Sequence, residues 1–443
     1  MTLRHSAPER AVLLCVCLLS FALAGCPESK TKESTGAGGP AAEKAPELTA
    51  DQKQAIQDVE SVGGKVEPPD GGPVTTIRLP DQSSANNDTL ALVAKFPNLE
   101  RLYVEGPDFG DEGMASIAKL TGLRVLSMQD SAVTGEGLKA LAPLKNLVEI
   151  NLRRTNVKDD GLVHLAAIKS LKSVNLTRTL IGDEGMKQIA ELPKLEVLNI
   201  EQTNVTDTGL TYLKDGQPLR AINFVGSQYG DPALETLARF KGLQVIEFDD
   251  AYNISDEGTK HLAGLPKLRI ISARRTFVGD QTLENIKGLS NLEQLFLRDT
   301  MVTNDGMAHL TGLKKLKLLD LNEVRSIGDA ALDHIGQVSS LENLGLWKTK
   351  VTDEGLKKLS SLEKLKELNL LETSIGNKGV ASLAGLPSLE VLILSSTQVD
   401  EGLDEILKSG FPKLRKLEVR GTNLKSDAAE KIETAKPGLQ VAY

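Results

Sequence analysis

The chain contains few of the residues that usually perform catalysis, bind metals or cross-link a fold. Its 443 residues include three cysteines, five histidines and one tryptophan, and aromatic residues make up 3% of the total. The formal net charge is −8, and no basic tail is present. An acidic chain of this kind is a poor ligand for the phosphate backbone, so the sequence argues against nucleic-acid binding. No phosphate-binding loop or nucleophile motif occurs, and we predict a protein that is not an enzyme and needs no cofactor.

Long apolar runs are also scarce, and the run from 11 to 24 near the start is too short to span a bilayer. Arg4 and Arg10 precede it, which is typical of a signal peptide. The run ends in Leu-Ala-Gly-Cys at 23–26, which resembles the lipobox of bacterial lipoproteins. This resemblance implies removal of residues 1–25, lipidation of Cys26, and an exported protein anchored in the membrane, in the outer membrane or facing the periplasm or the cell surface. Cys15 and Cys17 would be removed, so no disulfide is expected in the mature chain.

Two further segments precede the main part of the chain. Residues 26–48 are rich in Pro, Gly, Ala, Ser and Thr and predict a disordered tether. Residues 49–98 predict an N-terminal cap with a partial repeat: Thr49 and Gln52 have the spacing of a capping box, and strands are expected at Val66 and at 74–79. Residues 439–443 predict a C-terminal capping strand.

From 99 to 438 the sequence consists of fourteen repeats of 24 or 25 residues. The repeats begin at 99, 123, 147, 171, 195, 219, 243, 268, 292, 316, 341, 365, 389 and 414, and are numbered 1 to 14 in that order. In repeat 3, Ile150 and Leu152 are two apart, as in a strand with one buried face, and Leu162, Leu165 and Ile168 recur at helical spacing. One such unit cannot bury its own apolar face, so the repeats must stack.

The pattern L-x-x-L-x-L-x-x-T-x-V-x-D-x-G-L-x-x-L-x-x-L resembles a leucine-rich repeat, similar to those of ribonuclease inhibitor and of F-box proteins. The resemblance implies an α/β leucine-rich repeat solenoid (horseshoe) with a parallel sheet on its concave face and short helices on its convex face. The unbroken period predicts one elongated domain. Threonine occupies the column where many such repeats have Asn or Cys, and we interpret this column and the glycine of D-x-G-L as structural.

Polar residues on the helix side are expected to be structural as well. Acidic pairs such as Asp159-Asp160 and Asp353-Glu354 stand at helix starts, where negative charge is favourable. Four histidines occupy one outward position, namely His164, His261, His309 and His334. Neither set completes a metal site, so none is predicted.

Outward positions on the strands are therefore the candidates for binding. One column of asparagines predicts either a hydrogen-bonded ladder or a ligand site: Asn151, Asn175, Asn199 and Asn223. The main candidate site, in repeats 8 to 12, combines guanidinium groups with apolar area: Arg274, Arg275, Phe296, Arg298, Trp347 and Leu371. A second candidate patch is Arg153, Arg154 and Arg178. Charge pairing across strands, for example with Asp249 or Asp250, is the alternative for these arginines.

We predict a lipid-anchored envelope protein whose concave face binds a protein or peptide without catalysis. The sequence leaves two alternatives open. One is a structural spacer or self-associating scaffold of the cell envelope. The other, implied only by similarity to F-box repeat regions, is a substrate adaptor in ubiquitin ligation, although a signal and a tether stand where an F-box would be.

Overall fold

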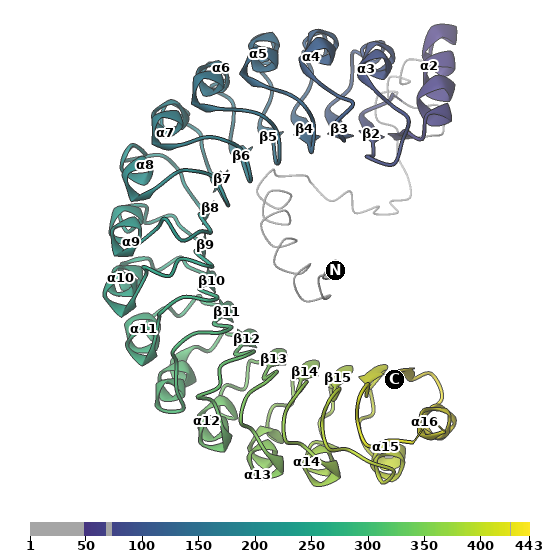
Figure 1. The fold of residues 1–443 in the computed structure, drawn as a ribbon, viewed down its shortest axis with the longest axis vertical. Coiled ribbons are helices and arrows are strands. Elements are labelled where there is room, and N and C mark those ends of the chain that lie inside the picture. Colours follow the sequence, from purple (N-terminus) through teal and green to yellow (C-terminus); the bar gives the residue numbers. More distant parts are fainter. Residues whose placement is uncertain (1–47, 68–72, 426) are drawn as a thin grey trace, which may run out of the picture. The chain divides into compact units, whose positions relative to one another are not determined.

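The computed structural model describes residues 48–67, 73–425 and 427–443. The predicted signal peptide, Cys26 and nearly all of the predicted tether lie outside these residues. The chain divides into two compact units, where the sequence predicts a single domain. Unit 1 contains the described residues up to 204 together with 212–221, and unit 2 contains 205–211 and the described residues from 222 to 443. The division falls within repeats 5 and 6, and both units are built from the same strand-and-helix repeat (Figure 1).

Each repeat contributes one short strand because its two inward apolar residues are two apart in the sequence. In unit 1 the strands are β1 (Lys65–Glu67), β2 (Thr76–Leu79), β3 (Arg101–Glu105), β4 (Val125–Gln129), β5 (Glu149–Asn151), β6 (Ser173–Asn175) and β7 (Val197–Asn199). β8 (Ala221–Asn223) lies at the division between the units. In unit 2 they are β9 (Val245–Glu247), β10 (Ile270–Ser272), β11 (Gln294–Phe296), β12 (Leu318–Asp320), β13 (Asn343–Gly345), β14 (Glu367–Asn369), β15 (Val391–Ile393), β16 (Lys416–Glu418) and β17 (Gln440–Ala442).

The strands pair in parallel and in register, repeat by repeat. Leu295 of β11, for example, lies opposite Ile271 of β10 and Leu319 of β12. Only the cap differs among the described pairings, because β1 runs antiparallel to β2. The predicted solenoid with a parallel sheet is therefore confirmed, and the predicted cap strands at Val66 and 74–79 are present as β1 and β2.

The segments that return to the next strand form short α- or 3-10 helices on the side away from the sheet (Figure 1). The α-helices of unit 1 are α2 (Ala50–Ser61), α3 (Asn87–Val93), α4 (Asp111–Ile117), α5 (Gly135–Leu138), α6 (Leu162–Ala166) and α7 (Asp183–Ile189). Those of unit 2 are α8 (Asp207–Thr211), α9 (Asp231–Leu237), α10 (Asp256–Thr259), α11 (Asp280–Ile286), α12 (Asp329–Ile335), α13 (Asp353–Leu356), α14 (Asn377–Ser382), α15 (Leu403–Ser409) and α16 (Ala428–Ala435). The 3-10 helices are η1 (Lys139–Leu141), η2 (Asp159–Gly161), η3 (Lys260–Gly264), η4 (Asp305–Gly312) and η5 (Lys357–Leu359).

The N-terminal cap begins with the predicted capping box. Gln52 N–H donates to Thr49 Oγ1 over 3.2 Å, and Thr49 N–H donates to Gln52 Oε1 over 3.0 Å. The apolar face of α2 buries Ala55 and Val59. This helix therefore covers core that would otherwise be exposed at the start of the solenoid.

The core of both units consists of the repeated leucines and their equivalents. In repeat 3, Ile150, Leu152, Leu162, Leu165 and Ile168 are all fully buried. Burying one such side chain contributes about 1.5–3 kcal/mol. Because every repeat supplies the same set to its neighbours, the fold has no need of a disulfide.

The threonine column is structural, as predicted. The hydroxyl of Thr155 donates to the Leu152 carbonyl over 2.7 Å, and the same bond to the residue three positions earlier recurs in the other repeats that carry threonine there. The bond closes the turn that follows each strand. The threonine hydroxyl donates its proton within the repeat, so this column is not a candidate for ligand binding.

The acidic residues at the helix starts act differently from the prediction. Asp280, the first residue of α11, does not cap its own helix. It accepts Thr303 N–H over 2.7 Å and the Thr303 hydroxyl over 2.6 Å from the next repeat. Equivalent bonds to the following repeat are made by Asp111, Asp159, Asp207, Asp231, Asp256, Asp329 and Asp353. These carboxylates hold consecutive repeats together.

The glycine of D-x-G-L is explained by the same contact. A Cβ atom on Gly306 would lie 2.2 Å from Asp280 Oδ1, and one on Gly355 would lie 2.3 Å from Asp329 Oδ1. Such distances are impossible without displacing the carboxylate. The predicted close packing at this glycine is confirmed, and the aspartate of the preceding repeat is its cause.

Candidate functional site

The main predicted site lies on the sheet face of unit 2. Phe296 stands in register with Ser272 and Asp320 on the neighbouring strands. Arg274, Arg298, Trp347 and Leu371 each follow two residues later in their own repeat. The residues that contact one another here are named the sheet-face cluster: Arg274, Phe296, Arg298, Asp320, Glu323 and Trp347.

Phe296 is not the exposed aromatic that the sequence predicts. Its side chain is only 5% exposed, because the Arg274 guanidinium lies over the ring, 4.5 Å from the ring centroid. Arg274 is itself 9% exposed. A cation stacked on an aromatic face is attracted by the ring electrons, by about 2 kcal/mol when desolvated. Phe296 therefore packs beneath Arg274 and is not itself available to a partner.

Two buried carboxylates flank Arg274. Asp320 Oδ2 lies 3.4 Å from Arg274 Nη2, and Asp249 Oδ1 accepts the Arg274 backbone N–H over 2.8 Å and the Ser272 hydroxyl over 2.7 Å. Burial raises the pKa of both carboxyl groups, and the positive charge of Arg274 opposes that rise. This arrangement is an internal ion cluster in which the charge of Arg274 is matched by carboxyl groups of the same chain.

Trp347 forms the more exposed part of the sheet-face cluster. Its indole is half-buried, with Arg298 at 4.8 Å and Lys348 Nζ at 5.8 Å from the ring centroid. Glu323 connects the two cations, at 3.4 Å from Arg298 Nε and 3.7 Å from Lys348 Nζ. The indole N–H is buried without a hydrogen-bond partner, as is Arg274 Nε. Each is a donor that the chain leaves unsatisfied, at a cost of about 1–3 kcal/mol.

A glycine makes room for the Asn322 side chain that holds the backbone of this tryptophan. Gly345 stands where the neighbouring strands carry Asp320 and Asn369. A Cβ atom there would lie 2.8 Å from the side-chain amide of Asn322, whose oxygen accepts Trp347 N–H over 2.9 Å. The position of Trp347 is thus fixed by contacts inside the chain, before any partner binds.

The remaining predicted residues of the main site are Arg275 and Leu371. Arg275 makes a two-bond ion pair with Asp250, at 2.5 Å from Nε and 2.8 Å from Nη2. This pair raises the pKa of the guanidinium further above its ordinary value. Leu371 is half-exposed in the repeat after Trp347, and its N–H donates to Asn369 Oδ1. The predicted pairing of charges across strands is confirmed for Arg275.

The second predicted patch has a simpler arrangement. Arg154 Nη1 lies 2.9 Å from Asp130 Oδ1, and Arg153 Nη1 lies 3.9 Å from Asp130 Oδ2. Arg178 Nε donates to Gln202 Oε1 over 2.5 Å. No described aromatic ring stacks on these three guanidinium groups in the contacts of unit 1. Their side chains lie near the surface, where ion pairs contribute about 0–1 kcal/mol.

The asparagine column favours the structural alternative. The side-chain oxygens of Asn151, Asn175, Asn199 and Asn223 each accept the backbone N–H two residues later. Such bonds end a strand in a turn. The amide nitrogen of Asn151 donates to Ser127 and that of Asn223 to Glu247, so parts of a side-chain ladder are present.

One feature of the loops gave no signal in the sequence. The residue after each outward position adopts a left-handed backbone conformation although it is not glycine, at Asp130, Arg154, Arg178, Gln202, Asp250, Arg275, Asp299, Glu323, Lys348, Glu372 and Ser396. This conformation turns the chain sharply out of the strand. Charged side chains are therefore presented at the loop edge beside the sheet.

Metal binding and membrane crossing find no support in the part of the chain that the structure describes. None of its histidine, cysteine and acidic residues gather in a group of three or more that could hold a metal ion. None of its helices is long and apolar enough to cross a membrane. The four histidines lie half-buried on the helix side, one in each of four repeats.

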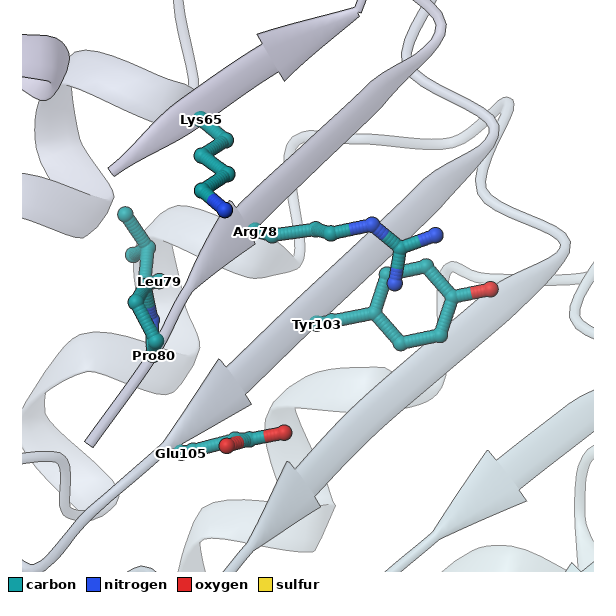
Figure 2. Close-up of a pocket in the computed structure, with 6 residues that line it drawn as sticks. All are labelled: Lys65, Arg78, Leu79, Pro80, Tyr103 and Glu105. Atoms are coloured by element: carbon teal, nitrogen blue, oxygen red, sulfur yellow. The ribbon is translucent and has the colours of Figure 1, made fainter. Parts of the chain in front are cut away.

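A small hollow lies in the N-terminal cap, lined by Lys65, Arg78, Leu79, Pro80, Tyr103 and Glu105 (Figure 2). The Arg78 guanidinium is stacked on Tyr103, 4.0 Å from the ring centroid. Burial, followed by the nearby negative charge of Asp130, raises the pKa of Glu105. The volume is about 110 Å³, whereas small-molecule pockets occupy about 300–1,000 Å³. The hollow is too small for a metabolite.

Comparison with known proteins agrees with this architecture. The family model for leucine-rich repeats matches residues 119–142 and 167–190. Comparison with curated proteins gives no match. A solved leucine-rich repeat protein of Leptospira interrogans is similar in fold, with a TM-score of 0.51 and 16% identity over 80% of this chain and 92% of that one. Rad7 of yeast, solved in complex with Elc1, gives a TM-score of 0.51 and 18% identity over 99% and 98%.

At these identities the likeness concerns the fold alone. The chain is a leucine-rich repeat solenoid, a class of scaffold that is generally non-catalytic and typically binds proteins.

Proposed function

We propose that the protein is a non-catalytic receptor that binds a protein or peptide on the sheet face of repeats 8 to 12. The observation that carries this proposal is Trp347, a half-buried indole on the sheet face that is bordered by Arg298 and Lys348. Tryptophan and arginine are the residues most often found as anchors of protein interfaces.

Contacts within the chain show which of the predicted residues can touch a partner. Arg274 and Phe296 are buried, so their role is to hold Arg298 and Trp347 in place. Lys348 borders the indole, and Leu371 follows in the next repeat. The Arg275–Asp250 pair lies three or more repeats before Trp347, at the other end of the proposed surface. A partner that supplies apolar area for the indole face and a carboxylate for the neighbouring cations Arg298 and Lys348 would match this surface.

The test begins with capture of a partner from envelope extract by the full chain, followed by affinity measurements on correctly folded variants. Trp347→Ala and Arg298→Ala should each weaken binding, the tryptophan by about 2 kcal/mol or more. Arg153→Ala and the helix-side variant His309→Ala should leave affinity unchanged. Binding weakened by Arg153→Ala alone would move the site to repeats 3 and 4. Absence of any saturable partner would favour the spacer.

We further propose that the protein is exported and anchored by lipid at Cys26. The support is the sequence alone: the apolar run, the Leu-Ala-Gly-Cys motif at 23–26 and the polar segment after it. Several acyl chains give effectively permanent attachment, at about 0.8 kcal/mol per buried methylene. Labelled fatty acid should enter the wild-type protein and should not enter Cys26→Ala. No label in the wild type would refute the proposal.

A further inference from the structure

Three large apolar side chains that do not belong to the sheet-face cluster are exposed in consecutive repeats of unit 2, in the loops that follow the strands. Tyr252 of repeat 7 is 45% exposed, Phe277 of repeat 8 is 61% exposed, and Met301 of repeat 9 is 62% exposed. These three residues are named the edge patch. Because neighbouring strands lie about 4.8 Å apart, the three side chains span roughly 10 Å. The Tyr252 and Phe277 ring centroids are 6.3 Å apart, so these two rings lie side by side.

The fold does not require apolar residues at this loop position. Tyr252 N–H donates within its own repeat to the Asp250 carbonyl over 3.1 Å, whereas Met301 N–H donates to the Val278 carbonyl of the preceding repeat over 2.9 Å. Repeats with a polar side chain make the same bond, including Asn204 to Ile181 and Lys350 to Ile327, each over 2.8 Å. The bond uses the backbone only, so the side chain is free to vary. A cluster of exposed apolar side chains that serves no packing role marks an interaction surface.

The charges beside the edge patch indicate what it binds. Asp250 is neutralised by Arg275, which leaves Asp299 as an exposed carboxylate next to Met301. Among the described ion pairs and side-chain hydrogen bonds, Asp299 has no partner. On the far side of Met301, the exposed Arg325 ends the apolar run. A ligand over the patch therefore needs apolar side chains and a cation placed for Asp299.

A second copy of this chain fits the patch poorly. In a symmetric dimer the two-fold axis that brings apolar side chains together passes through Phe277, so that Tyr252 meets Met301 of the other copy. The same axis places Asp299 opposite Asp250, which already pairs with Arg275, so the second copy brings no free cation to Asp299. Three side chains also fall far short of the approximately 800 Å² per partner that a stable protein interface buries.

We propose that the edge patch is a docking site for a short peptide segment of another protein, with two or three neighbouring apolar side chains followed by a lysine or arginine that pairs with Asp299. It is a site additional to the sheet-face cluster, and its test does not depend on that cluster binding anything. Its apolar residues supply affinity, and Asp299 selects the charge beside them.

The probe is a displayed library of short random peptides, selected on the full chain. Peptides enriched on the wild type should combine aromatic or aliphatic residues with an adjacent lysine or arginine. Their affinity should fall by about tenfold or more in Phe277→Ser. The matched control is Lys350→Ala, at the same loop position in repeat 11, which should bind as the wild type does. Phe277 is exposed, so the serine variant should fold, and circular dichroism checks this.

Charge reversal makes the test specific. A library selected on Asp299→Lys should yield peptides in which aspartate or glutamate replaces the basic residue. The proposal is wrong if the selected peptides bind Phe277→Ser and wild type equally, or if reversal at Asp299 leaves their charge unchanged. It is also wrong if sedimentation shows that the wild type is a dimer and Phe277→Ser a monomer, since a second copy would then occupy the patch.

Discussion

The helix starts and the sheet face of this chain come from the same repeat, but they use polar residues in opposite ways. At the helix starts, one contact recurs almost unchanged: an aspartate accepts the N–H that begins the next helix, and a glycine leaves room for it. On the sheet face of unit 2, consecutive repeats present Arg274, Arg298, Asn322 and Trp347 at one position, and each makes different contacts.

The difference separates what holds the fold from what can serve a partner. A contact that every repeat makes is needed wherever two repeats stack, so it carries no information about a ligand. A contact that occurs once is not needed for stacking. The sheet-face cluster and the edge patch are both of the second kind, whereas the histidines, the threonines and most of the acidic residues are of the first kind or are solvated.

Replacing Arg274 should give the largest effect on stability. Arg274→Ala leaves Asp249 and Asp320 buried without their cation, which costs about 3–5 kcal/mol. Arg154→Ala is the matched control, because that guanidinium is 52% exposed and its pair with Asp130 contributes less than about 1 kcal/mol. Urea unfolding of both variants measures the comparison. Equal losses would mean that Arg274 is no more important than a surface arginine.

The cost of Arg274→Ala should also depend on pH. Burial already raises the pKa of Asp249 and Asp320 above 3.8, and loss of Arg274 removes the charge that opposes this rise. A raised pKa in the folded state favours folding at low pH, and that contribution is lost as pH rises. The destabilisation should therefore be larger near neutral pH than near pH 4, roughly where free carboxyls titrate. A cost that grows as pH falls would contradict the cluster described here.

A methyl group at the helix starts should have an intermediate effect. Gly306→Ala forces a Cβ atom to within 2.2 Å of Asp280, so the repeat contact must break or shift. We expect a loss of about 1–3 kcal/mol, as in other overpacked sites. Gly288→Ala is the control, since no atom lies within 4 Å of its Cβ position. Thermal unfolding of both should show a loss only for Gly306→Ala. Equal unfolding temperatures would remove the explanation given for this glycine.

Replacing a left-handed loop residue by glycine should have the smallest effect on stability. Glu372 has φ of 53°, and its exposed side chain has no ion pair among the described contacts. The left-handed conformation costs an L-residue about 1–2 kcal/mol, and glycine avoids this cost. Glycine also makes the unfolded chain more flexible, which lowers the free energy of unfolding by about 0.5–1 kcal/mol. Glu372→Gly should therefore stabilise unit 2 by about 0.5 kcal/mol. Glu367→Gly, in β14, should destabilise it, and a loss in both variants would contradict this account.

The fold was predictable because its signal is repeated. Ile150, Leu152 and Leu162 each have an equivalent in almost every repeat, so the strand positions and the stacking follow from one unit. The aspartate-to-next-repeat bond was not predictable from one unit. It joins Asp280 to Thr303, and its geometry exists only after two repeats are stacked.

The candidate site was predicted in part, for a related reason. The strand period places Phe296, Arg298 and Trp347 on the outward face, and the structure agrees. The repeat period does not predict that Arg274 covers Phe296, because this contact depends on side-chain rotamers in adjacent repeats. The edge patch was missed since its three residues lie in loops, where the sequence pattern has no fixed face.

The most direct test of the account is amide hydrogen exchange of the full chain with and without its captured partner. Exchange should slow at the strand ends and loops of repeats 8 to 12, around residues 272–275, 296–299 and 345–348, and should stay unchanged at the helix starts. Protection confined to the strand ends near Arg153 and Arg178, or to the helix starts, would contradict the claim that the unrepeated contacts of unit 2 form the binding surface.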